Sequence, residues 1–177
     1  GLTDQVSFRV ADAEELPFDD ETFDAVITES VLSLLDDKSR AIRELARVTR
    51  RGGYVGLNES TWLKSPPPED VQKWVSRQRG IETNILTAVE WTELLTAAGL
   101  TESGLETSPV RMKNELRGLK RRYGKGEMGK VFARMLRLFI SRPAYRTFLK
   151  NLKRSGGIPK ELTRYLGYGL YTGRKPS

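Results

Sequence analysis

Two acidic side chains lie just after two predicted strands. Residues 6–10 alternate apolar and polar side chains, which predicts a strand, and Asp12 comes shortly after them. Residues 24–28 are mostly apolar, as buried parallel strands are, and Glu29 comes next. A carboxylate can accept a hydrogen bond from an N–H donor, and it can accept a proton as a general base. Asp12 and Glu29 are therefore the first candidates for chemistry.

The composition removes several kinds of site. The chain has 177 residues, with no cysteine and no histidine. Disulfides and thiolate metal sites are excluded, and so are a protease-like triad and a histidine-ligated zinc site. We predict no metal site. If the reaction needs a general base, Glu29 is the candidate.

The elements between and after these carboxylates predict a strand–helix–strand order. Asp36 or Asp37 can cap a helix, and we expect the Arg51-Gly52-Gly53 run to end it. Residues 54–57 then read as another strand. Short connections between such elements are typical of βαβ units and a parallel sheet. The apolar positions of the helix are Ala41, Ile42, Leu45 and Val48.

The sequence after residue 57 predicts two more helices and two more strands outside the basic segment. A helix is expected over residues 69–78, and Thr87 with Glu90 forms a capping box for the next helix. Residues 101–108 and 165–174 read as strands. The apolar face of the capped helix consists of Trp91, Leu94, Leu95 and Ala98.

Four stretches, in this order, resemble class I S-adenosylmethionine (SAM)-dependent methyltransferases of the small-molecule type, similar to quinone-biosynthesis C-methyltransferases. They are residues 10–18, 23–32, 41–54 and 90–100. The third is similar to the helix, turn and strand that contain Pro-Gly-Gly in the family, although Arg51 replaces the proline. The resemblance covers roughly residues 1–110 and the last strand.

The resemblance implies a fold, a cofactor and a reaction. The fold is α/β: a Rossmann-like, mostly parallel sheet of strand order 3-2-1-4-5-7-6, N-terminally incomplete here, with a helical insertion before the last strand. The reaction is methyl transfer from SAM to a small-molecule acceptor. By position, Asp12 and Ala13 would hold the adenine. Glu29 and Ser30 would lie against the methionine part of SAM and face the acceptor.

Two features that bind SAM in the resembled family are absent. No Gly-x-Gly-x-Gly turn occurs, and the family's second strand, after which an acidic residue holds the ribose, has no counterpart in this sequence. We interpret the chain as the C-terminal part of a Rossmann-like domain (1–110), a basic helical insertion (111–158) and a final strand (159–177). The strands at 6–10 and 24–28 would then expose unpaired edges. We therefore expect a dimer, a swapped assembly or a missing half as partner.

The net charge of +7 hides an asymmetry. Residues 1–110 hold 11 basic and 20 acidic residues, whereas residues 111–154 hold 15 basic and 2 acidic residues. One interpretation is an ordinary solvated surface. The other is an anionic partner: a phosphorylated substrate, a nucleic acid or a membrane surface.

The basic segment predicts two or three helices, broken near Gly124 and at Pro143. Its central helix has an apolar stripe opposite a basic one, so it either packs on the domain or forms a lid over an anionic or lipophilic acceptor. A further interpretation of these helices is peripheral contact with an anionic membrane. RNA is less favoured, because the aromatic side chains do not interleave with the charges. The apolar stripe is Val131, Phe132, Met135, Leu136 and Phe139, and the basic one includes Lys130, Arg134 and Arg137.

Two other classes of function remain open. One is a non-catalytic methyltransferase-like interaction module, and the other is a protein whose basic helices bind a membrane or a nucleic acid. The sequence shows no secretory signal and no apolar run long enough to span a bilayer, so we expect a cytoplasmic protein.

Overall fold

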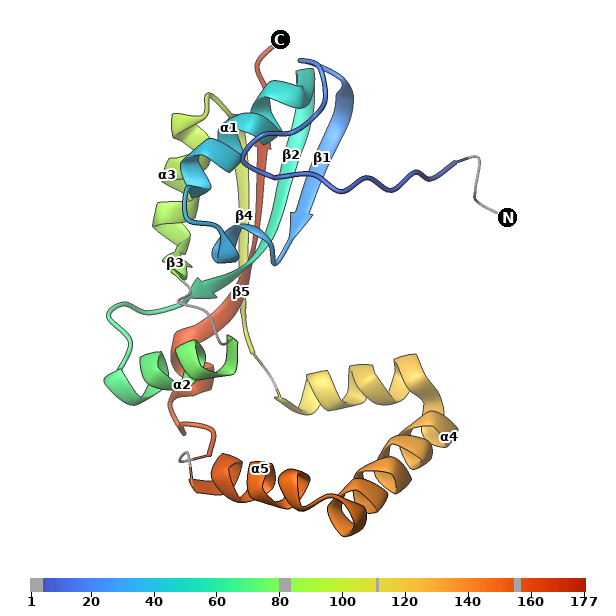
Figure 1. Ribbon diagram of the computed structural model, residues 1–177. Helices are drawn as coiled ribbons and strands as arrows, with labels where there is room; N and C mark the ends of the chain where they lie inside the picture. Colours follow the sequence, from blue (N-terminus) through green and yellow to red (C-terminus); the bar gives the residue numbers. More distant parts are fainter. Residues whose placement is uncertain (1–4, 80–83, 111, 155–156) are drawn as a thin grey trace. The chain divides into compact units, whose positions relative to one another are not determined.

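The computed structural model describes residues 5–79, 84–110, 112–154 and 157–177 (Figure 1). The chain divides into two compact units. The sheet unit comprises the chain up to Pro109 together with Arg164–Ser177, and the helical unit comprises Val110–Thr163.

The sheet unit contains a mixed sheet in the order β1-β2-β5-β4, with β3 paired to β2. β1 runs parallel to β2, whereas β5 runs antiparallel to both β2 and β4. The predicted α/β class is confirmed, and the order reproduces the 4-5-7-6 half of the family's sheet. The strands are β1 (Phe23–Glu29), β2 (Thr49–Trp62), β3 (Leu86–Thr87), β4 (Thr101–Pro109) and β5 (Leu166–Arg174).

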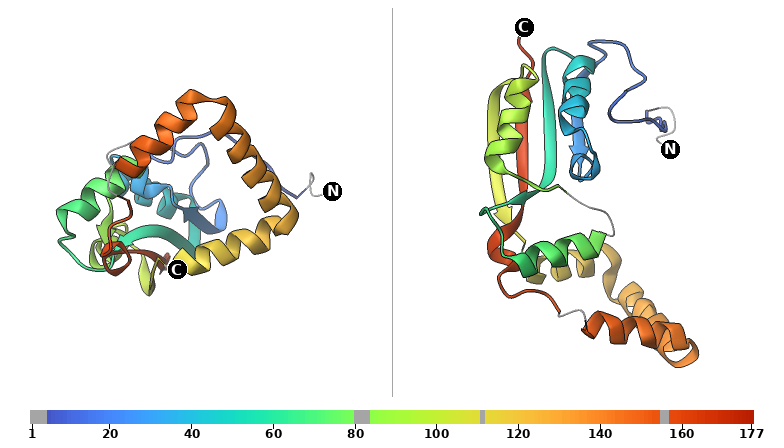
Figure 2. Two further views of the ribbon diagram at one scale, coloured as in Figure 1. Left: turned by 90° about the horizontal axis from the view of Figure 1, so that it is seen from below. Right: turned by 60° about the vertical axis from the view of Figure 1, so that its left-hand side comes forward.

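Two helices, α1 (Lys38–Val48) and α3 (Ala88–Ala97), pack side by side on one face of this sheet (Figures 1 and 2). The short 3-10 helix η1 (Leu32–Leu34) precedes α1, and α2 (Glu69–Arg79) follows β2. Alternate side chains of β2 and β5 point into the core beneath the helices, as the period of a strand requires. The largest fully buried side chains here include Trp91, Tyr171, Leu32, Ile42 and Leu57.

Both predicted helix caps on this face are confirmed. Asp37 caps α1, because its Oδ1 accepts a hydrogen bond from the Arg40 N–H at 2.8 Å. Thr87 and Glu90 form the reciprocal capping box of α3. Each cap satisfies backbone N–H groups that the first turn of a helix leaves without partners.

The prediction that the Arg51-Gly52-Gly53 run ends α1 is wrong. The helix ends at Val48, and β2 begins at Thr49. The glycines instead serve an irregularity in the β1–β2 pairing, where Gly52 has a φ of 74°. A Cβ on Gly53 would lie 2.6 Å from the Asp24 carbonyl oxygen, so a side chain there would clash with the neighbouring backbone.

The predicted strand at residues 6–10 is also wrong. The segment is extended but pairs with no strand, and Phe8 and Val10 are 96% and 101% exposed. A strand is stabilised by hydrogen bonds to a neighbour. Within the described ranges, β1 pairs only with β2, and no strand lies beside residues 6–10. The expected unpaired edge of β1 is therefore present.

The sheet face opposite α1 and α3 carries exposed apolar side chains. Ile27 is 78% exposed and Tyr54 is 50% exposed. Tyr168 and Leu170 of β5 are exposed on the same side, since they alternate with the buried Tyr171.

The helical unit contains α4 (Met112–Ser141), α5 (Pro143–Arg154) and the first half of the short α6 (Leu162–Tyr165). α4 is broken at Gly124, whose φ of 68° and ψ of 170° are not helical. The predicted breaks near Gly124 and at Pro143 are confirmed. In the part of the chain that the structure describes, no helix combines the length and apolarity that crossing a bilayer requires.

Candidate functional site

The carboxyl end of β1 presents two of the predicted residues. Glu29 is the last residue of β1 and is exposed. Ser30 follows with a φ of 56°, and its N–H donates to the Asn58 carbonyl oxygen at 2.8 Å. This turn lies where a parallel pair of strands ends, which is the usual place for ligands in open α/β sheets.

A buried carboxylate that sequence reasoning missed holds the loop after this turn. Glu59 of β2 is 0% exposed. Its Oε1 accepts hydrogen bonds from the N–H groups of Val31 and Leu32 at 3.0 and 2.9 Å, and its Oε2 accepts one from Ser33 at 3.2 Å. The alternation of β2 was the available signal, since Glu59 shares a face with the buried Leu57.

A buried amine lies at the other end of the same loop. The Lys38 Nζ donates to the Leu35 carbonyl oxygen at 2.7 Å. Burial lowers the pKa of Lys38, and the carboxylates of Asp36, Glu59 and Glu14 oppose that shift. The loop between β1 and α1 is therefore hydrogen-bonded to one buried carboxylate, that of Glu59, and to one buried amine, that of Lys38.

The turn that contains Asp12 and Ala13 is formed locally. The Asp12 Oδ1 accepts a hydrogen bond from the Glu14 N–H at 2.9 Å, and Asp12 forms an isolated β-bridge with Glu15. Asp12 is exposed and Ala13 is half-buried. A short Asp side chain that bonds the backbone two residues on is typical of a turn.

This turn is tied to the start of α1. The Glu14 Oε1 accepts a hydrogen bond from the Asp37 N–H at 3.2 Å, and the Arg40 guanidinium forms an ion pair with Glu15 at 3.3 Å. The first turn of α1 therefore lies against the residues that follow Asp12.

Arg47 and Glu44 of α1 form hydrogen bonds with the turn at residues 16–18. The Arg47 guanidinium donates to the carbonyl oxygens of Leu16 and Phe18 at 3.0 and 2.8 Å, and to the Asp20 carboxylate at 2.7 Å. Arg47 also bonds both oxygens of Glu44 at 2.8 Å, while the Leu16 N–H donates to Glu44 at 2.9 Å. The hydrogen bond from Arg47 lowers the pKa of Glu44, and the pKa of Arg47 is raised in return.

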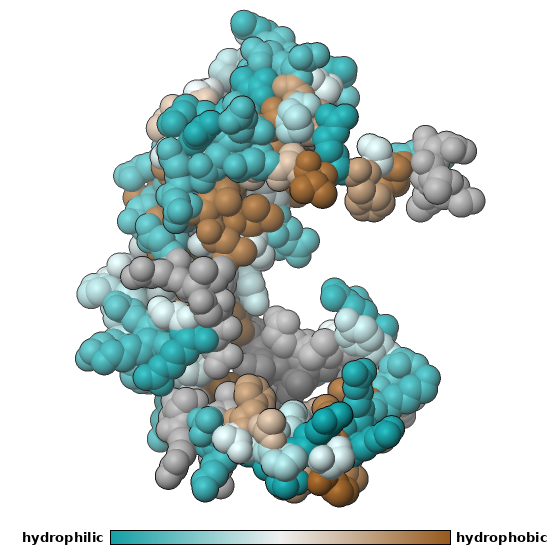
Figure 3. Space-filling model, in the orientation of Figure 1, coloured by the Kyte–Doolittle hydropathy of each residue, from teal (hydrophilic) through white to brown (hydrophobic). Residues whose placement is uncertain are grey.

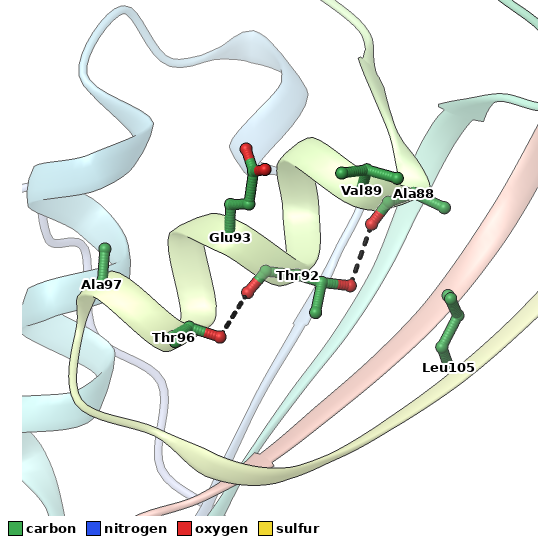
Figure 4. Close-up of a pocket in the computed structure, with 7 residues that line it drawn as sticks. All are labelled: Ala88, Val89, Thr92, Glu93, Thr96, Ala97 and Leu105. Carbon is green, nitrogen blue, oxygen red and sulfur yellow. Dashed lines mark hydrogen bonds between the residues drawn. The ribbon is translucent and has the colours of Figure 1, made fainter.

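A separate apolar groove of about 580 Å³ lies between α3 and β4 (Figure 4). The Thr92 and Thr96 hydroxyls donate to carbonyl oxygens of their own helix at 2.9 Å, so they offer no free donor to a ligand. β4 and β1 are at opposite ends of the strand order, which separates this groove from Glu29. The groove is lined by Ala88, Val89, Thr92, Glu93, Thr96, Ala97 and Leu105.

Taken together, the structure places Glu29 and Ser30 at one turn and Asp12 and Ala13 at another. Both turns contact α1 or the segment that leads into it. The arrangement offers exposed carboxylates on a rigid support, and it can bind and orient a polar ligand. The individual roles of these four residues stay predictions.

The fold is that of class I methyltransferases. The Haemonchus contortus phosphoethanolamine N-methyltransferase 2, solved with phosphomonomethylethanolamine and S-adenosylhomocysteine, superimposes with a TM-score of 0.69. That match covers 95% of this chain and 37% of the other, at 18% identity. The [4+2]-cyclase SpnF superimposes with a TM-score of 0.62 over 99% of this chain and 57% of its own, at 24% identity. At these identities the likeness concerns the fold alone.

Sequence similarity points to methyltransferases. Residues 1–57 match the methyltransferase domain family. The 27-O-demethylrifamycin SV methyltransferase of Amycolatopsis mediterranei is 35% identical over 105 residues, which are 59% of this chain and 37% of the relative. The ubiquinone/menaquinone biosynthesis C-methyltransferase UbiE of Idiomarina loihiensis is 46% identical over 59 residues, covering 33% and 24%. The predicted resemblance is confirmed, and the chain spans less than two-fifths of either relative.

Proposed function

We propose that this chain contributes to SAM-dependent methyl transfer to a small-molecule acceptor. The proposal rests on one observation, that the stretch matching a methyltransferase domain is also the stretch that forms the candidate site. The stretch that matches the methyltransferase domain, residues 1–57, contains both turns described above, and the Glu29 turn stands at the carboxyl end of β1. Relatives of this chain are named as methyltransferases of a rifamycin, of ubiquinone/menaquinone biosynthesis and of phosphatidylethanolamine.

The residues present fit the two ends of SAM. One oxygen of Asp12 accepts the Glu14 N–H, and the exposed carboxylate has further acceptor capacity for the adenine amino group. In this proposal, Glu29 and Ser30 contact the methionine end of SAM. Bound SAM would supply an electrophilic methyl group. The chain's own contribution is to orient donor and acceptor, which can lower the barrier substantially.

Proton removal is needed only for some acceptors. If the acceptor must lose a proton, Glu29 is the proposed base, because it is an exposed carboxylate at the proposed site.

A second candidate is a methyltransferase-like module that does not transfer methyl groups. One observation favours it: the same fold occurs in a protein named as a [4+2]-cyclase. Fold by itself does not determine the reaction.

Calorimetric titration of the chain with S-adenosylhomocysteine separates the two candidates. Saturable binding that Asp12→Ala weakens by about 1–3 kcal/mol, the cost of a lost buried hydrogen bond, supports the cofactor site. Glu106→Ala on β4 is the matched control and should bind as the parent does. Binding that Asp12→Ala leaves unchanged refutes the adenine role, and absence of binding favours the second candidate.

A further inference from the structure

The helical unit has an exposed apolar surface that the proposed methyl transfer does not use. In the half of α4 that follows Gly124, apolar residues recur at helical spacing and remain accessible. Phe132 is 71% exposed and Ile140 is 69% exposed. Figure 3 shows apolar and hydrophilic surface side by side over α4 and α5. The exposed apolar residues are Val131, Phe132, Met135, Leu136, Phe139 and Ile140 in α4 and Phe148 in α5.

Three arginines gather on the side of α4 opposite the apolar stripe and at the residue that follows the helix. Arg134, Arg137 and Arg142 line a hollow of about 420 Å³ together with Leu138 and Ser141. All three are exposed, and none of them forms an ion pair with another residue that the structure describes. Guanidinium groups bind phosphate oxygens with two parallel hydrogen bonds, so the hollow suits phosphate groups.

From residue 128 of α4 to the end of α5 the sequence offers no counter-charge. Residues 128–160 hold nine basic and no acidic side chains. A second copy that approached through the same surface would bring like charge, which disfavours self-association there. RNA would need aromatic side chains among the charges, whereas here they lie on the apolar stripe.

The corner between the two helices is held in place. The Arg146 Nη1 donates to the carbonyl oxygens of Phe139 and Ile140 at 2.9 Å each, which joins α5 to the last turn of α4. The rings of Tyr145 and Phe148 stack with centroids 6.2 Å apart. These contacts fix the orientation of α5 relative to the last turn of α4.

We propose that α4 and α5 dock the protein on the surface of an anionic phospholipid bilayer. Apolar side chains enter the boundary between head groups and acyl chains, and the long arginine side chains of the opposite face extend to the lipid phosphates at head-group level. Amphipathic helices that combine a wide apolar face with basic residues bind bilayers in this way. The inference is independent of methyl transfer, because it uses no residue of the proposed SAM site.

Vesicle flotation of the full chain tests the proposal. We expect the protein to float with phosphatidylcholine vesicles that contain phosphatidylglycerol and to stay behind with phosphatidylcholine alone. At about 1 M salt, where the Debye length is about 3 Å, binding should weaken strongly. The triple variant Arg134→Gln, Arg137→Gln, Arg142→Gln should lower the partition coefficient about 100-fold, since each basic residue near the surface contributes about fivefold.

Two matched variants make the test decisive, with circular dichroism to verify folding. Arg40→Gln, Arg50→Gln, Arg51→Gln removes the same charge from the sheet unit and should change the partition coefficient less than about threefold. Phe132→Ser with Ile140→Ser should reduce flotation and leave the free energy of unfolding unchanged. Absence of flotation, equal effects of both arginine triples, or serine variants that destabilise the fold while flotation persists would overturn the proposal. Tighter binding to polyuridylate than to anionic vesicles would also overturn it.

Discussion

Glu59 is the residue whose replacement tests the description of the β1 loop most directly. One carboxylate accepts three backbone N–H groups at 2.9–3.2 Å in a fully buried position. In Glu59→Gln the amide oxygen can keep the bonds from Val31 and Leu32. The amide nitrogen would then face the Ser33 N–H, so one buried donor loses its acceptor and the charge is lost. Because a hydrogen bond to a charged group contributes about 1.5–3 kcal/mol, we expect the free energy of unfolding to fall by that amount.

Glu59→Ala should cost more. All three N–H groups lose their acceptor, and two of them belong to the buried residues Leu32 and Ser33. At about 1–3 kcal/mol for each unsatisfied buried group, partly relieved by entering water, a loss of about 3–5 kcal/mol is expected.

Urea unfolding followed by fluorescence measures these losses, and amide hydrogen exchange locates them. Exchange should accelerate most at Ser33 in the Gln variant, because its N–H loses its acceptor. The matched control Glu106→Gln changes an exposed carboxylate on β4 and should alter the free energy of unfolding by less than about 0.5 kcal/mol. If Glu59→Gln is as stable as this control, or if exchange at residues 31–33 is unchanged, the anchoring role is refuted.

Three further predictions concern α1 and α3. Arg47→Ala should lower the free energy of unfolding by about 1–3 kcal/mol and speed hydrogen exchange at Leu16, because the carbonyl oxygens of Leu16 and Phe18 lose their donor. Unchanged exchange at Leu16 would contradict the proposed role of these hydrogen bonds. The pKa of Glu44 is lowered in the fold, so its stabilisation is complete above the unfolded pKa of about 4.3 and is lost as the pH falls through the folded pKa. Urea midpoints measured against pH should drop in this acidic range, and less steeply in Glu44→Gln. Thr87→Ala should cost about 1 kcal/mol in thermal unfolding by loss of the capping box, whereas Thr96→Ala, whose hydroxyl bonds within the helix, should cost less.

Local chemistry made part of this fold predictable from the sequence. Asp37 and the Thr87–Glu90 pair were predicted as caps because their side-chain chemistry acts within a few residues. The order of the four main strands came from the resemblance, since nothing in short-range pattern says that β5 lies between β2 and β4. The failures at residues 6–10 and at the paired glycines have one cause. Both depend on what lies beside the backbone, a missing neighbour strand in the first case and the close Asp24 carbonyl in the second.

The candidate site divides in the same way. Glu29 and Asp12 could be singled out because acidic residues after strands are visible in a linear sequence. Glu59 could not, because its partners Val31, Leu32 and Ser33 are more than 25 residues away and use only backbone atoms. Long-range side-chain to backbone bonds leave no motif, although the alternation of β2 does place Glu59 on the buried face.

The contacts around the two turns bear on how a failure to bind SAM would be interpreted. Glu14 and Glu15 tie the Asp12 turn to the start of α1, and Glu59 holds the loop after the Glu29 turn, so each turn is supported by a neighbouring element of this same chain. A chain that fails to bind would therefore lack ligand contacts and would not lack order at these turns. Hydrogen exchange decides between the two causes. Protection at residues 30–33 that is already high without S-adenosylhomocysteine indicates missing contacts, whereas low protection there would contradict the support that the structure assigns to Glu59.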